Sequence, residues 1–186
     1  MTKLHLGSGG KNIPGFINID VRADCGADVV ADITSISKVF QNVDVCYNSH
    51  LLEHFPRKSL EIFPKTYKDV LKDWYKCLKV GGKLFISVPD FDAICRVYQQ
   101  NGNIKELYGL LLGGQRPERG NFDIHFHVFD EKSLREDLEE IGFKNVKRFD
   151  RWEQKWLTID DYSAATLNPP FDKNGILMSL NLECEK

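Results

Sequence analysis

Four residues of this 186-residue chain have the types and the spacing that a nucleoside-binding site requires. Gly7 and Gly9 follow an apolar run, and glycines in such a turn let a ligand approach the backbone closely because no side chain intrudes. Asp20 ends a second apolar run, where a carboxylate can accept two hydrogen bonds from a ribose diol. Asp32 ends a third run and is placed to meet an adenine amino group. Because an aspartate at a strand end more often caps a turn than binds a ligand, the prediction depends on the joint order of the four residues.

The glycine pattern separates several kinds of nucleotide site. A dinucleotide fingerprint, GxGxxG, requires a third glycine at the position of Asn12, so that pattern fails. The phosphate-binding pattern GxxxxGK[ST] does not occur in the sequence either. The turn is therefore expected to hold an uncharged or zwitterionic group rather than a pyrophosphate.

Short, nearly continuous apolar runs predict strands that are buried on both faces of a parallel sheet. Such strands are expected at 4–7, 16–21, 27–33, 43–49 and 83–90. Apolar residues at helical spacing predict helices at 65–78, 92–100, 103–112 and 130–141, with a loop at 113–123. Two late strands, 145–149 and 176–183, are expected to form an antiparallel hairpin. The order predicts an α/β, Rossmann-like fold in one domain, 1–186, with a mostly parallel seven-stranded sheet.

The connections after the first two strands are too short for ordinary crossover helices. Only five residues separate Gly10 from Phe16, and only five separate Val21 from Ala27. A parallel crossover usually takes a dozen or more residues, mostly helical. We therefore expect these two helices to be shortened or absent, and the uncovered face to be closed by the segment 151–175 or by a second subunit in a homodimer. The alternative is that the first two strands do not pair in parallel.

Several stretches resemble the motifs of class I S-adenosylmethionine-dependent methyltransferases. LHLGSGG resembles their glycine motif, NID their ribose acid and VADI their adenine-contact motif. DVCYNSHLLEHF resembles the motif after the fourth strand, and LKVGGKLFISVPD and IHFHVFDEKSLREDLEEIGF resemble later signatures. The likeness covers residues 3–150 and is greatest to small bacterial predicted methyltransferases, some of them associated with cell-surface glycan synthesis. It implies S-adenosylmethionine as cofactor and a small-molecule or saccharide acceptor.

The resemblance also implies which residues contact the cofactor. They are Gly7, Ser8 and Gly9 at the methionine part, Asp20 at the ribose, Asp32 and Ile33 at the adenine, and Asn48, Ser49 and His50 at the amino acid end. The first strand of the family usually carries an acid before the glycines, and this chain has His5 there. The contact to the cofactor's ammonium group is therefore expected to come from backbone carbonyls.

Candidate catalytic residues follow from residue type alone. Methyl transfer from a sulfonium is a direct displacement, so orientation is essential and a general base is optional. His54, His125 and His127 are candidates for a base, and Asp90 borders the same crevice and either orients the acceptor or caps a helix. His125 and His127 form an HxH pair, but two ligands do not make a metal site without a third, and no metal is expected. Aromatic residues of the late loops are expected to stack on an acceptor or to pack the loops: Phe122, Phe126, Phe129, Trp152 and Trp156.

Composition narrows the class of protein. The net charge of −2 gives no sign of a nucleic-acid-binding surface, and no apolar run approaches the ~20 residues of a membrane span. Five cysteines without a CxxC pair and the lack of a leader sequence favour a cytoplasmic protein. Two other functions stay open: an NAD-dependent oxidoreductase, which Asn12 disfavours, and a non-catalytic domain that binds S-adenosylmethionine or a partner.

Overall fold

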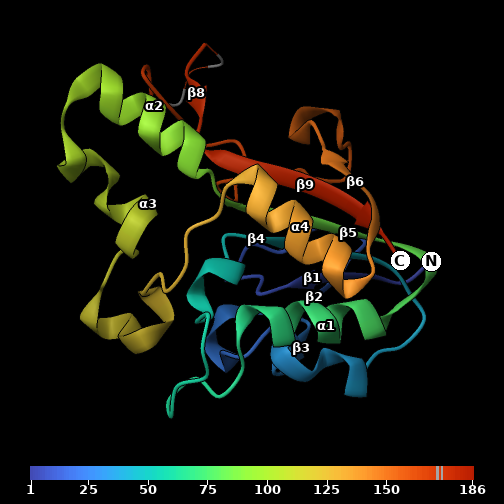
Figure 1. The fold of residues 1–186 in the computed structure, drawn as a ribbon. Coiled ribbons are helices and arrows are strands. Elements are labelled where there is room, and N and C mark those ends of the chain that lie inside the picture. Colours follow the sequence, from blue (N-terminus) through green and yellow to red (C-terminus); the bar gives the residue numbers. More distant parts are fainter. Residues whose placement is uncertain (171, 173) are drawn as a thin grey trace.

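The computed structural model describes residues 1–170, 172 and 174–186. Its main sheet has seven strands in the order β3-β2-β1-β4-β5-β9-β6 (Figure 1). The strands of this sheet are β1 (Lys3–Leu6), β2 (Ile17–Asp20), β3 (Val29–Val30), β4 (Val43–Ser49), β5 (Leu78–Pro89), β6 (Lys144–Arg148) and β9 (Ser179–Glu185). β1 to β5 pair in parallel, while β9 lies antiparallel between β5 and β6. The predicted fold, a mostly parallel sheet that ends in two antiparallel late strands, is confirmed.

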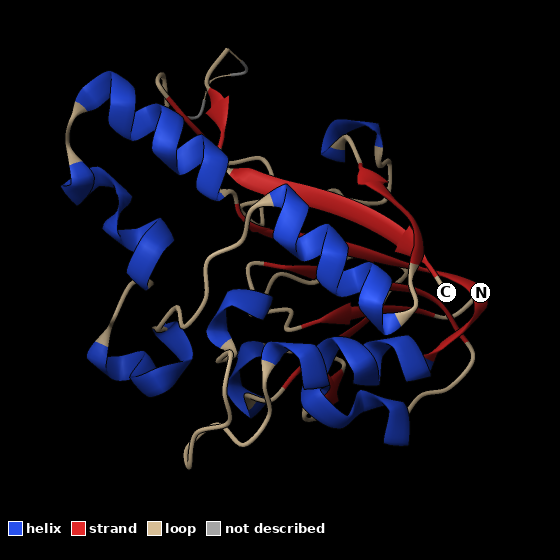
Figure 2. Ribbon diagram, viewed as in Figure 1, coloured by secondary structure: helices blue, strands red, loops and turns tan. Residues whose placement is uncertain are grey.

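The helices surround this sheet unevenly. The α-helices are α1 (Tyr67–Cys77), α2 (Phe91–Asn101), α3 (Tyr108–Leu112) and α4 (Glu131–Ile141). The 3₁₀ helices are η1 (Ala23–Cys25), η2 (Ile33–Lys38), η3 (Leu52–His54), η4 (Ile104–Leu107), η5 (Pro117–Asp123) and η6 (Arg151–Glu153). Figure 2 shows α2, η4, α3 and η5 as an arm that extends beyond the carboxyl ends of the parallel strands. None of the helices in the described part of the chain is long and apolar enough to cross a membrane.

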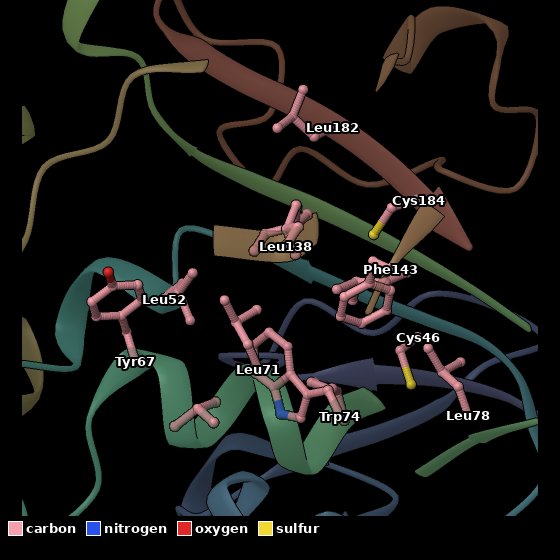
Figure 3. Close-up of a cluster of buried hydrophobic side chains, with 14 of the residues drawn as sticks. Cys46, Leu52, Tyr67, Leu71, Trp74, Leu78, Leu138, Phe143, Leu182 and Cys184 are labelled. Atoms are coloured by element: carbon pink, nitrogen blue, oxygen red, sulfur yellow. The ribbon is translucent and has the colours of Figure 1, made fainter. Parts of the chain in front are cut away.

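One face of the sheet is covered by α1 and α4, which lie side by side (Figure 1). Their apolar stripes meet the strands in the largest hydrophobic core, part of which Figure 3 shows. Trp74 of α1 is fully buried there, and its Nε1 donates a hydrogen bond to the carbonyl oxygen of Ile33 at 2.9 Å. Because that carbonyl follows β3, the tryptophan links α1 to the end of the sheet that carries the pocket described below.

Helix α1 begins with a complete capping box. Thr66 Oγ1 accepts a hydrogen bond from the backbone N–H of Asp69 at 3.2 Å, and the Asp69 carboxylate accepts one from the backbone N–H of Thr66 at 3.0 Å. We expect Thr66→Ala to lower the free energy of unfolding by about 1 kcal/mol, because one helix N–H loses its acceptor. Thr66→Ser keeps the acceptor and should stay within about 0.5 kcal/mol of the wild type. Urea unfolding of both variants measures the difference, and equal losses would show that the cap is not the cause.

The opposite face carries a second core, because neighbouring residues of a strand point to opposite sides. Cys46 and Leu84 belong to the first core, whereas Tyr47 and Phe85 belong to the second. No helix lies between β1 and β2 in residues 7–16, all of which are described, and only the single turn η1 follows β2. The predicted loss of two crossover helices is thus confirmed, and β1 pairs with β2 in parallel.

The segment after β6 closes the face that the missing helices would have covered. Trp156 lies against Phe16, Tyr47 and Phe85, with ring centroids 5.0–5.3 Å apart. Leu157 belongs to the same core. The sequence left two possibilities for this face, the segment 151–175 or a second subunit. The described part of 151–175 covers it within one chain. Phe171 and Lys173 of the predicted segment lie outside the described residues.

Several predicted boundaries were wrong. The strand expected at 27–33 has only two residues, because Asp32 accepts a hydrogen bond from Thr34 N at 2.8 Å and begins η2. The helix expected at 103–112 is divided into η4 and α3, and the loop expected at 113–123 contains η5. The strand expected at 176–183 is two strands, because β8 (Ile176–Leu177) pairs with β7 (Thr166–Leu167) in a separate small sheet.

Candidate functional site

One pocket of about 410 Å³ opens at the carboxyl ends of β1 to β4. Its lining comes from the turns after these strands and from two later loops. The lining residues are Gly7, Gly9, Asp20, Val21, Arg22, Asp32, Ile33, Thr34, His50, Leu51, His54, Phe55, Phe63, Pro64, Lys65, Glu118, Arg119 and Phe122. This volume lies within the range of about 300–1,000 Å³ that is usual for small-molecule sites, and the carboxyl ends of parallel strands are where such sites form in open α/β sheets.

The glycine turn after β1 forms the floor of the pocket. Gly7 and Gly9 have φ angles of 68° and 60°, in the left-handed region that favours glycine. A Cβ atom on Gly7 would lie 2.7 Å from Leu51 Cδ1, so the absence of a side chain lets the segment after β4 close against the turn. At Gly9 the same atom would meet nothing closer than 3.8 Å, so the space above Gly9 is open to a ligand.

Asp20 lies beside this turn at the end of β2. Its Oδ2 accepts a hydrogen bond from Gly9 N at 2.8 Å, and its Oδ1 accepts bonds from Arg22 N at 2.9 Å and Arg22 Nε at 3.2 Å. A carboxylate has about four lone-pair sites, so one stays free without any movement. A second becomes free if the partly exposed Arg22 side chain swings away, which is enough for a diol.

Asp32 and Ile33 form the neighbouring wall. Asp32 accepts hydrogen bonds from Thr34 N and from Thr34 Oγ1, at 2.8 and 2.9 Å, and caps η2 while its side chain borders the pocket. Ile33 is buried and adds an apolar surface next to it. A carboxylate beside an aliphatic surface suits an adenine ring, which has an amino group at its edge and an apolar face.

Three of the predicted cofactor residues lie behind the lining. Ser8 is buried, and its Oγ has no hydrogen-bond partner among the described residues. Asn48 is fully buried, with its Nδ2 3.4 Å from Phe85 O, and Ser49 Oγ donates to Asp161 O at 2.7 Å. Of the residues predicted at the tip of β4, His50 alone lines the pocket, and contacts of the other two with a cofactor stay predictions.

His5, which stands at the usual position of an acid, is buried in the sheet. Its Nδ1 lies 3.2 Å from Asn18 Oδ1, and His5 is not among the pocket-lining residues. Burial lowers the pKa of His5, although the hydrogen bond to Asn18 opposes this effect. A neutral ring behind the turn supplies no negative charge for a ligand's ammonium group.

The four predicted catalytic residues have different surroundings. His54 lines the pocket, and its Nδ1 lies 2.9 Å from Ile124 O. His125 lies behind it, with ring centroids 4.8 Å apart. His127 points elsewhere: it stacks on Tyr67 at 4.5 Å, and burial lowers its pKa to about 4. Asp90 is buried, caps α2 and forms an ion pair with Arg148 at 3.3 Å, which gives it the capping role of the two expected.

Of the outer wall of the pocket, the sequence had pointed only to Phe122, as one of the late aromatic residues expected to stack on an acceptor or to pack the loops. Phe63 and Lys65 come from the loop before α1, and Glu118, Arg119 and Phe122 come from η5. Of the late aromatic residues, Phe122 lines the pocket and is 59% exposed, whereas Phe129 and Trp156 pack into cores. No short motif marks these wall residues, because they meet the glycine turn only through the fold.

The pocket therefore fits a nucleoside with a zwitterionic tail. A free acceptor on Asp20, open space above Gly9 and the carboxylate of Asp32 beside the apolar Ile33 all lie in the lining of this one pocket. His50 and His54 lie farther along the lining, together with the charged and aromatic wall, and leave a second region for another reactant.

Comparisons with known proteins agree with this geometry. A family model described as a methyltransferase domain matches residues 14–148, well over half of the chain. Solved structures of SAM-dependent methyltransferases from Archaeoglobus fulgidus and Methanosarcina mazei superpose with TM-scores of 0.57 and 0.56, at 14% and 15% identity. Each alignment covers 100% of this chain, and 86% and 92% of the other chains respectively. No curated protein sequence matches the chain. At such low identity the structural likeness shows the fold alone.

Proposed function

The chain belongs to the methyltransferase domain family and is an S-adenosylmethionine-dependent transferase, and we propose that its acceptor is a small molecule or a saccharide unit. The observation that carries the proposal is the lining of the pocket at the carboxyl ends of the parallel strands. It extends from the glycine turn, past His50 and His54, to a wall of mixed aromatic and charged residues. A pocket of about 410 Å³ favours a compact acceptor group over a broad macromolecular surface.

The proposed roles of the cofactor residues follow the order of the lining. When bound, S-adenosylmethionine would supply a methyl group on a sulfonium: an atom of the acceptor would bond to the methyl carbon as the carbon–sulfur bond breaks, and S-adenosylhomocysteine would be the leaving group. The turn at Gly7 and Gly9 lets the methionine part approach the backbone, and Asp20 accepts hydrogen bonds from the ribose hydroxyls. Asp32 and Ile33 border the adenine. These residues bind and orient, and orientation alone can supply about 7–11 kcal/mol of a reaction barrier.

The acceptor is proposed to bind on the side of His50, His54 and Phe122. The exposed ring of Phe122 offers an apolar face on which a sugar or an aromatic ring can stack. Glu118 and Arg119 beside it supply a carboxylate and a guanidinium for the polar groups of such a ligand. This mixture of an aromatic surface and a few polar groups is typical of small-molecule sites.

Calorimetric titration and a methyl-donor assay test the proposal. In the titration, we expect S-adenosylhomocysteine to bind one site per chain and NAD not to bind. In the assay, the enzyme receives S-adenosylmethionine and a panel of saccharides, sugar nucleotides and small hydroxylated compounds. We expect S-adenosylhomocysteine to form when the panel contains the acceptor. Binding of NAD without binding of S-adenosylhomocysteine would overturn the proposed cofactor roles. Cofactor binding without turnover on the panel would contradict the acceptor class and favour the non-catalytic alternative.

A further inference from the structure

A buried carboxylate that makes no hydrogen bond within the described part of the chain lies directly behind the pocket. Glu53, in the single turn η3, is 0% exposed, and neither Oε1 nor Oε2 has a hydrogen-bond partner among the described residues. Three histidines surround it: His50 Nδ1 lies 3.4 Å from Oε1, His125 Nε2 lies 3.9 Å from it, and His54 is the next residue along the chain. Leaving a buried charge uncompensated is costly, so a charge-balancing partner is required.

Two of the three rings, those of His54 and His125, are held so that one nitrogen of each stays free to bind a ligand. Nδ1 of His54 lies 2.9 Å from Ile124 O, and Nδ1 of His125 lies 2.9 Å from Leu110 O. Because a carbonyl oxygen only accepts, each Nδ1 must carry the proton and donate it, which leaves Nε2 of each neutral ring as an acceptor. Metal-binding histidines have this arrangement, with the second ring nitrogen donating to a backbone carbonyl.

The backbone holds these groups together before any ligand arrives. Glu53 O accepts hydrogen bonds from Phe126 N at 2.8 Å and His127 N at 3.3 Å, which fastens the strand-like segment at 124–127 to η3. The ligand atoms of Glu53, His54 and His125 all lie within 4.8 Å of one another. Ligands of a tetrahedral ion with bonds of about 2.0–2.1 Å lie about 3.3 Å apart, so small side-chain rotations would complete the site.

We propose that Glu53, His54 and His125 form a binding site for a divalent transition-metal ion such as Zn²⁺. Two imidazoles and one carboxylate are the donor set of catalytic zinc sites and of other open divalent sites, which keep at least one position for water or substrate. The HxH pair does not form the site by itself: Glu53 and His54 join His125, while His127 takes no part because its ring stacks on Tyr67.

The site borders the pocket through His54. The role of the ion in binding the acceptor therefore rests on the proposed function. The open coordination position would take an oxygen atom of the acceptor and hold it beside the methyl donor. A coordinated hydroxyl group also loses its proton more readily than a free one. His54 then acts as a ligand rather than as a general base, since one Nε2 cannot do both.

Zinc titration of the chelator-treated, full-length protein tests the metal site without any acceptor. We expect one Zn²⁺ per chain with micromolar or tighter affinity, a higher Tm when Zn²⁺ is present, and an intense visible spectrum when Co²⁺ replaces it. Glu53→Gln and His125→Asn each remove one ligand and should weaken Zn²⁺ binding at least about tenfold. His127→Asn, two residues from His125 but outside the site, is the matched control and should bind Zn²⁺ like the wild type.

The Tm of the variants and their binding of S-adenosylhomocysteine separate a failure of the metal site from a failure of the proposed function. Glu53→Gln removes the uncompensated charge, so without metal its Tm should equal or exceed that of the wild type, while Zn²⁺ should raise the Tm of the wild type alone. Three results would overturn the site and favour a protonated histidine beside Glu53. They are equal Zn²⁺ affinity in all variants, binding of less than half an ion per wild-type chain, and loss of Zn²⁺ binding after alkylation of the cysteines. Zn²⁺ binding without binding of S-adenosylhomocysteine would instead contradict the proposed function and leave the metal site standing.

Discussion

Asp20→Ala is expected to raise the Kd for S-adenosylhomocysteine about 10- to 150-fold, a loss of roughly 1.5–3 kcal/mol, which is typical for a hydrogen bond to a charged group. The carboxylate lies at the end of β2 with at least one free acceptor site, next to the open space above Gly9. Its removal takes away the acceptor for the ribose and also frees Gly9 N and Arg22, so the turn loses an internal support. Calorimetric titration measures the change.

Two further variants separate the ribose contact from the support of the turn. Asp20→Asn keeps one acceptor oxygen and the shape of the side chain but loses the charge, so it should weaken binding less than alanine does. Asp24→Ala alters an exposed carboxylate in η1 that does not line the pocket, and it should leave the Kd unchanged. An unchanged Kd in Asp20→Ala, with the Tm of the wild type, would remove Asp20 from the site.

The sequence was sufficient for the parts of this fold that depend on local pattern. The apolar runs and the helix stripe predicted the strand order in the chain, the helix α1 and the antiparallel late strands. The five-residue connections predicted that two helices are missing, because connection length limits what can be built. Strand β3 was overestimated because VADI is apolar enough for a strand, yet Asp32 caps a turn that ends it early.

The candidate site was predictable only where it is local. Gly7, Gly9 and Asp20 are close in sequence and came together as expected, because β1 and β2 are neighbours. Glu53 and His125 are 72 residues apart, and their contact depends on how the segment at 124–127 crosses η3. The sequence periods of strands and helices, two and 3.6 residues, carry no information about such a long-range contact. The same holds for Glu118 and Arg119, which the arm beyond the sheet brings to the pocket.

A buried ion pair lies within the segment after β6 that covers one face of the sheet. Arg151, which begins η6, lies 3.5 Å from Asp161, and the two side chains are 11% and 6% exposed. Arg151 also donates hydrogen bonds to Ser163 Oγ, at 2.8 Å, and to the carbonyl oxygen of Ile159. Asp161 accepts a hydrogen bond from the hydroxyl of Tyr47 in β4, so the pair fastens the cover to the sheet.

Arg151→Met is therefore expected to lower the free energy of unfolding by about 3–5 kcal/mol, because a buried carboxylate loses its counter-charge. The loss should lie toward the lower end, since Asp161 keeps its hydrogen bonds from Tyr47 and Ser163. Adding Asp161→Asn should restore much of the stability, whereas Trp152→Ala, at a 59% exposed position in the same turn, should cost no more than about 0.5 kcal/mol. Urea unfolding measures all three. A loss below 1 kcal/mol in Arg151→Met would show that the apolar contacts of Trp156 and Leu157 hold the cover without this ion pair.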